Sequence, residues 1–317
     1  MTRDTTGAPG ASRLAIVGAF AAVYLLWGST YLAIRFAIET LPPFTMAGVR
    51  FLVAGAPLYI WTLWRTRERP SLLHWRSAVV IGGLMLLGGN GGVVWSEQFV
   101  PSGLAALMVA TVPLWMVLFE WMGPEGTRPT RLTLLGLVVG FAGVAVLVGG
   151  EESLDAARVP WVPAGVLLFA SASWAVGSLY SRRATLPRSP LLATAMEMLG
   201  GGALLVLAGL LSGEGSEIAL ESISPRSAIS LAYLIVFGSI VAFSAYIWLL
   251  RVTTPARVST YAYVNPVVAV VLGWLLASEP LTPRIGIAAA LITAAVFAVV
   301  LSRDQSSSKV QQEQKKG

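Results

Sequence analysis

Cysteine is absent from the 317 residues of this chain, and histidine occurs only once, at His74. The lack of thiols excludes disulfide bonds, thiolate nucleophiles and thiolate metal sites. A single histidine near basic residues is typical of a solvated loop, and a metal site generally needs several ligands. We therefore expect no metal site and no other cofactor.

Charge is scarce as well. Charged residues make up 12% of the chain and hydrophobic residues 56%, and the mean hydropathy is +0.73. A protein so poor in charge cannot cover a soluble surface, so the lipid bilayer is its expected solvent. The net charge of +6 is not gathered on one soluble face, which argues against a nucleic-acid partner.

Long apolar stretches are what the sequence does have. Ten of them approach the roughly 20 residues that a helix needs to cross a membrane. Continuous strands of alternating polarity are absent, and helices are the other way to pair backbone groups in lipid. The sequence therefore predicts an all-α membrane protein with ten transmembrane helices, at residues 14–34, 44–64, 77–97, 102–122, 132–148, 161–180, 191–211, 228–250, 256–277 and 285–301.

The lysine and arginine residues indicate the orientation. With both termini in the cytoplasm, 17 of the 22 lie in cytoplasmic segments, four lie in outer loops and Arg50 lies inside the second helix. Residues 1–13 then form a cytoplasmic N-terminal segment, and 149–160 form a periplasmic linker. The polar tail 302–317 is expected to be disordered in the cytoplasm.

The chain also repeats itself. Tryptophan, proline and charged positions match at an offset of 147 and then of 153, namely Trp27 with Trp174, Pro43 with Pro190, Arg50 with Glu197, Trp95 with Trp248, Pro113 with Pro266 and Trp121 with Trp274. Residues 14–148 and 161–301 thus form two five-helix repeats. Because five crossings are an odd number, the repeats are inverted, as in many secondary transporters. The alternative is a duplication kept only as a stable scaffold.

Two charged residues are expected about 10 Å deep in the membrane, Arg50 in the second helix and Glu197 in the seventh. They could bind the charged ends of a zwitterionic substrate or pair with other groups in a gate. Arg50 could instead extend to the interface. Glu197 is also a candidate for coupling transport to protons, since burial favours a neutral carboxyl.

Polar and proline residues mark further candidates. Asn90 lies in a run of four glycines, which lets a ligand or another backbone come close. Pro113 and Pro266 each free a backbone carbonyl, so they could be hinges or simple packing kinks, and Asn265 precedes the second of them.

Aromatic residues within the helices could line a cavity for apolar or aromatic solutes, or form interfacial belts. The candidates are Trp27, Tyr31, Trp95, Trp174, Trp248, Tyr261 and Tyr263. Gly136 and Gly140 permit a close helix contact, which we assign to the interior of one chain. The sequence leaves the choice between monomer and homodimer open.

Four motifs together resemble the drug/metabolite transporter superfamily, in particular its EamA-type, YedA-like exporters. They are Trp27-Gly-Ser-Thr-Tyr31, the run Pro-Pro-Phe-Thr-Met-Ala-Gly-Val-Arg-Phe that ends at Phe51, Ala110-Thr-Val-Pro113, and Tyr261-Ala-Tyr-Val-Asn-Pro-Val267. The resemblance implies a ten-helix basket with cytoplasmic termini in a bacterial inner membrane. It also implies efflux of amino acids or related metabolites, with Arg50 at the family's arginine position.

The sequence thus predicts a secondary transporter that exports small metabolites, such as amino acids or related aromatic compounds, by alternating access. A facilitator or antiporter of phosphorylated or nucleotide-linked sugars is the alternative, and it predicts several cations in the cavity. An enzyme is not expected, because no nucleophile elbow, His-Glu-x-x-His motif or paired acidic motif is present.

Overall fold

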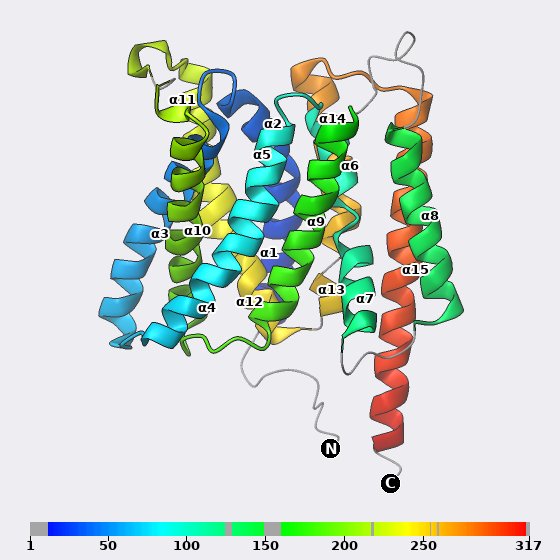
Figure 1. Ribbon diagram of the computed structural model, residues 1–317. Helices are drawn as coiled ribbons and strands as arrows, with labels where there is room; N and C mark the ends of the chain where they lie inside the picture. Colours follow the sequence, from blue (N-terminus) through cyan, green and yellow to red (C-terminus); the bar gives the residue numbers. More distant parts are fainter. Residues whose placement is uncertain are drawn as a thin grey trace.

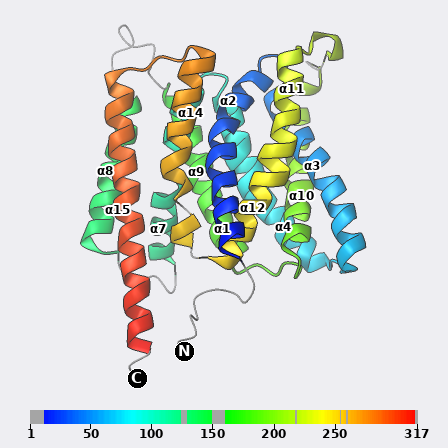
Figure 2. The same ribbon diagram turned by 180° about the vertical axis from the view of Figure 1, so that it is seen from behind.

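The computed structural model of the chain describes residues 12–123, 129–148, 160–216, 219–253, 255–258 and 260–314. Within these ranges every regular element is helical, and the helices run side by side in one bundle (Figure 1). α1 begins at the bottom of this view, and Figure 2 shows the same arrangement from behind. We call that end of the bundle the lower end and the opposite one the upper end.

The first half of the chain supplies five membrane helices, three of which change their winding or break along their length. They are α1 (Arg13–Ala21) with a π-helical segment (Ala22–Leu26) and α2 (Trp27–Ala37); α3 (Pro43–Thr66); α4 (Leu72–Gly82) with a π-helical segment (Gly83–Gly91) and α5 (Gly92–Ser96); α6 (Ser102–Val109) with α7 (Val112–Met122); and α8 (Arg131–Val148).

The second half repeats this plan. Its helices are α9 (Trp161–Ser181); α10 (Pro190–Leu211); α11 (Pro225–Tyr233) with a π-helical segment (Leu234–Phe243) and α12 (Ser244–Val252); α13 (Pro255–Val258) with α14 (Tyr261–Ala277); and α15 (Pro283–Gln314). Two short 3-10 turns, Glu214–Ser216 and Leu220–Ser222, connect α10 to α11.

Ten helical spans therefore stand where the sequence predicts them. Eight are long and apolar enough to cross a membrane, and two shorter apolar helices, Val264–Ala277 and Pro283–Val299, correspond to the ninth and tenth. For the first eight spans the boundaries agree with the expected ones within about five residues.

Two local expectations are corrected. His74 is not in a loop, because it lies in the first turn of α4, where its backbone N–H donates to the Ser71 hydroxyl at 3.3 Å and its Nδ1 accepts from the Ser71 N–H. α15 continues to Gln314 and so takes in most of the tail for which the sequence predicts disorder. No glycine or proline occurs between Ser302 and Gln314 to stop the helix.

Proline and serine fix where several helices begin. Pro43, Pro190 and Pro225 occupy the first turn of α3, α10 and α11, where a missing N–H costs nothing. The hydroxyls of Ser189 and Ser224 each accept a hydrogen bond from the backbone N–H three residues later.

Glycines let the two halves pack backbone against backbone. A Cβ added at Gly48 of α3 would lie 3.0 Å from the Gly202 carbonyl oxygen of α10, and one at Gly202 would lie 3.1 Å from the Gly48 oxygen. The predicted contact through Gly136 and Gly140 is confirmed, and it joins α8 to α15, where an added Cβ at Gly136 would lie 3.0 Å from the Ala295 oxygen.

Carboxylates cap α3 and α10 reciprocally. Glu214, which follows α10, accepts hydrogen bonds from the N–H groups of Phe44 and Thr45 at the start of α3. Glu68, which follows α3, accepts hydrogen bonds from the N–H groups of Arg188 and Ser189 at the start of α10. α3 and α10 are therefore antiparallel, and each half of the chain holds the end of a helix of the other half.

Large apolar side chains face outward along the bundle. Leu211, Trp64 and Val138 are exposed by 81%, 75% and 68%. Water-soluble monomers rarely show so much apolar surface, so this outer face suits the acyl chains of a bilayer.

Candidate functional site

A cavity lies near the middle of the bundle, where helices from both halves meet. Its empty volume is about 660 Å³, counting space that is open to solvent. It is lined by Trp27, Thr30, Tyr31, Ile34, Arg50, Phe51, Leu86, Gly89, Asn90, Val93, Val109, Ala170, Trp174, Gly238, Phe243, Tyr261 and Asn265. Two of the π-helical segments, those in the third and eighth spans, supply part of this wall, and such segments often mark functional sites.

Arg50 brings a positive charge to the cavity. Its side chain is only 3% exposed, and its Nε donates a hydrogen bond to the Ser239 hydroxyl at 2.8 Å. The guanidinium carbon lies 4.7 Å from the centre of the Phe51 ring. Nη1 has no hydrogen-bond partner in the described part of the chain, and no carboxylate there forms an ion pair with Arg50. A buried guanidinium with an open donor is suited to an anionic group of a ligand.

The two predicted asparagines differ in their surroundings. The side-chain oxygen of Asn90 is buried at the cavity and has no donor among the described residues, so it can accept a hydrogen bond from a ligand. The Asn265 amide is satisfied when its nitrogen faces the carbonyls of Tyr24 and Tyr261, at 3.0 and 3.2 Å. Asn265 therefore joins the first span to the ninth as well as lining the cavity.

An aromatic cluster closes the lower side of the cavity. The Trp27 ring centre lies 4.9 Å from that of Tyr246, 5.5 Å from Tyr261 and 5.6 Å from Trp174. Trp27 is held in place because its Nε1 donates a hydrogen bond to the Gly238 carbonyl at 3.2 Å. Tyr246 is completely buried and lies outside the cavity wall, so the cluster fills the space below the cavity.

The other predicted aromatics are distributed differently. Tyr31 lines the cavity. Trp95 packs against Phe99 with ring centres 5.0 Å apart, and Trp248 packs against the apolar core, so neither lines the cavity. The side chain of Tyr263 lies outside the described part of the structure.

Glu197 is buried but separate from the cavity. It is 0% exposed, and neither carboxyl oxygen has a hydrogen-bond partner in the described part of the chain. Arg251 and Tyr246, both on α12, interact electrostatically with it. The structure therefore brings Arg50 and Asn90 together at the cavity and leaves Glu197 on the lower side, next to the aromatic cluster.

Of the two predicted hinge prolines, one follows a helix break and the other lies inside a helix. Pro113 is in the first turn of α7, after the break at Ala110 and Thr111 that divides the fourth span. Pro266 lies inside α14, two helical turns after the break between α13 and α14.

Several site residues have no signal in the sequence. Ser239 and Phe243 are ordinary residues of an apolar helix, and only the packing of α3 against the eighth span shows their role. Glu97 directly follows the third span, where a carboxylate usually reaches the interface, yet it is completely buried. Among the described residues, no group of three or more potential metal ligands occurs.

Comparison with known proteins agrees with this architecture. The sequence model of the EamA-like transporter family matches residues 13–149 and 162–301. An uncharacterized inner membrane transporter, YedA of Escherichia coli K12, is 44% identical over 290 residues, which are 91% of this chain and 90% of that protein. The uncharacterized transporter YoaV of Bacillus subtilis is 25% identical over 87% of this chain and 93% of its own length.

A solved crystal structure shares the fold, with a TM-score of 0.65 and 24% identity, over 92% of this chain and 100% of that one. The two matched segments coincide with the two halves of the bundle. The chain therefore belongs to the EamA-like transporter family, a family of membrane transporters and not of enzymes.

Proposed function

We propose that this chain is a secondary transporter of a bacterial inner membrane that exports small metabolites by alternating access. The substrates are amino acids or related compounds, aromatic ones included. The observation that carries the proposal is the buried Arg50 guanidinium, which offers an unpaired donor to a cavity with aromatic walls.

The arrangement of the two halves supports alternating access. α3 and α10 are antiparallel, cap each other and meet at Gly48 and Gly202, as inverted repeats about an axis in the membrane plane would. Such repeats place the substrate near the midplane, and the two sides of the site then open in turn. With the lower end in the cytoplasm, as the basic residues predict, the aromatic cluster is the cytoplasmic side of the site.

The chemistry of the wall supports a zwitterionic substrate. A carboxylate can accept hydrogen bonds from the open Nη1 of Arg50, and an ammonium group can donate to the side-chain oxygen of Asn90. An apolar or aromatic side chain can rest on Trp27 and Phe243. A phosphorylated sugar needs several cations, and Arg50 is the one cationic residue among the described residues of the wall.

We place the hinges of the movement at the break before Pro113 and at Pro266 inside α14, because a helix that lacks a backbone hydrogen bond bends most easily there. The eighth span carries its π-helical segment at a position that corresponds to the one in the third span. The segment of the third span packs on α10 and that of the eighth span packs on α3, so a change in their winding would act directly on this central pair.

Counterflow in proteoliposomes tests the proposal. Vesicles loaded with unlabelled L-phenylalanine, L-threonine or glucose 6-phosphate receive a trace of the same labelled compound outside. We expect accumulation with an amino acid, and its loss in Arg50→Met. Arg65→Met is the control, since Arg65 is exposed and lies beside Trp61 on the outside of the bundle. No counterflow with any of a broad panel of metabolites, or equal counterflow in Arg50→Met, would contradict the proposal.

A further inference from the structure

Glu97 is a buried carboxyl for which the transport cavity has no use. It directly follows Ser96, the last residue of α5, in the connection between the third and fourth spans at the upper end. Its exposure is 0%, and neither carboxyl oxygen has a hydrogen-bond partner in the described part of the chain. A carboxylate cannot be held in such a place without donors, so the neutral, protonated form is favoured.

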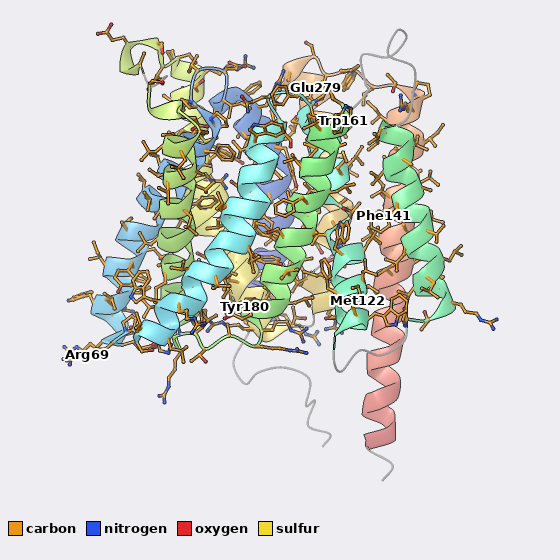
Figure 3. All side chains as sticks on the ribbon, in the orientation of Figure 1. Arg69, Met122, Phe141, Trp161, Tyr180 and Glu279 are labelled. Carbon is orange, nitrogen blue, oxygen red and sulfur yellow. The ribbon has the colours of Figure 1, made fainter. Side chains whose placement is uncertain are left out.

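The charged groups around Glu97 are compatible with a protonated, neutral carboxyl group. Arg35, at the end of α2, donates from Nη1 to the Glu97 backbone carbonyl at 2.6 Å and forms no ion pair with its carboxyl group among the described residues. Glu279, at the upper end in Figure 3, accepts hydrogen bonds from the N–H groups of Ser102 and Gly103 and from the Ser102 hydroxyl. Its negative charge is thus held by the start of α6.

Burial raises the pKa of Glu97 well above its ordinary value, and the negative charge of Glu279 raises it further, while Arg35 opposes both. The geometry independently favours the protonated acid, because no hydrogen-bond donor among the described residues faces the Glu97 carboxyl group. An opening of the upper end that admitted water would let the Glu97 carboxylate form and pair with the nearby Arg35 guanidinium.

Three tyrosines lie near the cavity and the two buried carboxyls. Tyr31, on α2, lies in electrostatic range of Glu97 and lines the cavity. Tyr261 also lines the cavity, in range of Tyr31, and its ring centre is 5.8 Å from that of Tyr246. Tyr246 exchanges a hydrogen bond with the Ser178 hydroxyl at 3.0 Å and is in electrostatic range of Glu197.

We propose that Glu97 is the proton-binding site of the upper end and Glu197 that of the lower end. On this proposal the hydroxyls of Tyr31, Tyr261 and Tyr246 line the wall between the two carboxyls. The proposal rests on the proposed transport function and names protons as the coupling partner.

Each step is the transfer of one proton. With the upper end open, a proton from water binds the Glu97 carboxylate, and the neutral acid then permits this end to close. With the lower end open, Glu197 loses its proton to water and its carboxylate is stabilised by Arg251. With both ends closed, the Glu97 acid gives its proton to the Tyr31 hydroxyl, and each of the three tyrosine hydroxyls passes one proton on as it receives one. Glu97 is then a carboxylate again, and Glu197 is again a neutral acid. Inward proton movement is thereby exchanged for outward movement of the metabolite. The titratable and charged groups that face the two sites are Tyr31, Arg35 and Glu279 at Glu97, and Tyr246 and Arg251 at Glu197.

The proton sites can be tested without a substrate. Infrared difference spectra of the purified full chain, recorded as pH is raised, should show loss of the carbonyl band of a protonated buried carboxylic acid. Glu97→Gln and Glu197→Gln should each remove part of this band. Glu39→Gln, at the same end as Glu97 and partly exposed beside Arg226, should leave it unchanged. A band that is identical in wild type and Glu97→Gln would overturn the proposal.

Transport measurements separate this proposal from the transport function itself. With labelled L-phenylalanine, an acidic vesicle interior should drive uptake by wild type. In Glu97→Gln, which mimics the protonated acid, this gradient-driven uptake should fall by about tenfold or more. Counterflow with equal pH on both sides should remain as in wild type. Glu97→Asp should restore the response to the gradient. Counterflow with no effect of the gradient in wild type, or full gradient-driven uptake in Glu97→Gln, would overturn proton coupling and leave the transport function standing.

Discussion

Arg50→Met should impair function without impairing the fold. Methionine keeps an unbranched apolar chain of similar length, but it removes the guanidinium charge and the hydrogen bond to Ser239. Arg50 therefore offers a clear test of whether this buried charge is present for ligand binding or for stability.

The free energies can be estimated from the contacts of Arg50. The substitution loses one hydrogen bond to a charged group, about 1.5–3 kcal/mol, and a cation–π contact with Phe51, about 0.5–2 kcal/mol. It also removes the cost of burying an ion that has no counter-charge, which is several kcal/mol. We expect a free energy of unfolding that is unchanged or raised by up to about 2 kcal/mol. The affinity for a carboxylate substrate should fall by about 10- to 150-fold, as the loss of a charge-assisted hydrogen bond predicts.

Thermal unfolding of the detergent-purified variants, with and without L-phenylalanine, measures both effects. A ligand that binds only the folded protein raises the unfolding temperature, so the rise should occur in wild type and in Arg65→Met and disappear in Arg50→Met. If Arg50→Met without ligand unfolds well below wild type and Arg50→Lys restores the stability, the positive charge at this position is structural and the reasoning is refuted.

Two further predictions concern packing and pH. Gly48→Ala should lower the stability by about 1–3 kcal/mol, because the added Cβ would lie 2.8 Å from the Val206 backbone nitrogen and force α3 from α10. Gly18→Ala, inside α1 with nothing within 4 Å of its added Cβ, should not lower the stability in the same unfolding assay. Since the pKa of Glu97 is raised on folding above its ordinary 4.5, its contribution to stability is complete below that pH and is lost as pH rises through the raised value. Unfolding curves measured upward from pH 5 should therefore fall more steeply for wild type than for Glu97→Gln, and parallel curves would contradict this.

The sequence alone was sufficient for the spans and their order. Hydrophobic length in lipid leaves few alternatives to a helix, so the ten stretches and their proline and serine starts were predictable from local signals. The matched tryptophans and prolines indicated two repeated halves, and the depth of Arg50 in its helix indicated a functional residue, because a charge there is costly.

The tertiary structure decided which of these residues belong to one site. Arg50 and Asn90 come together with Trp27 and Tyr261 because helices from both halves surround one cavity, whereas Glu197 is buried and does not line it. Trp95 and Trp248 are tryptophans within predicted helices, as Trp27 is, but they pack outside the cavity. The sequence does not show which face of each helix points toward the cavity. Glu97 shows this limit most clearly. A carboxylate at the end of a span commonly reaches the interface, and only the tertiary structure shows that Glu97 is buried, with Arg35 of α2 bound to its backbone carbonyl.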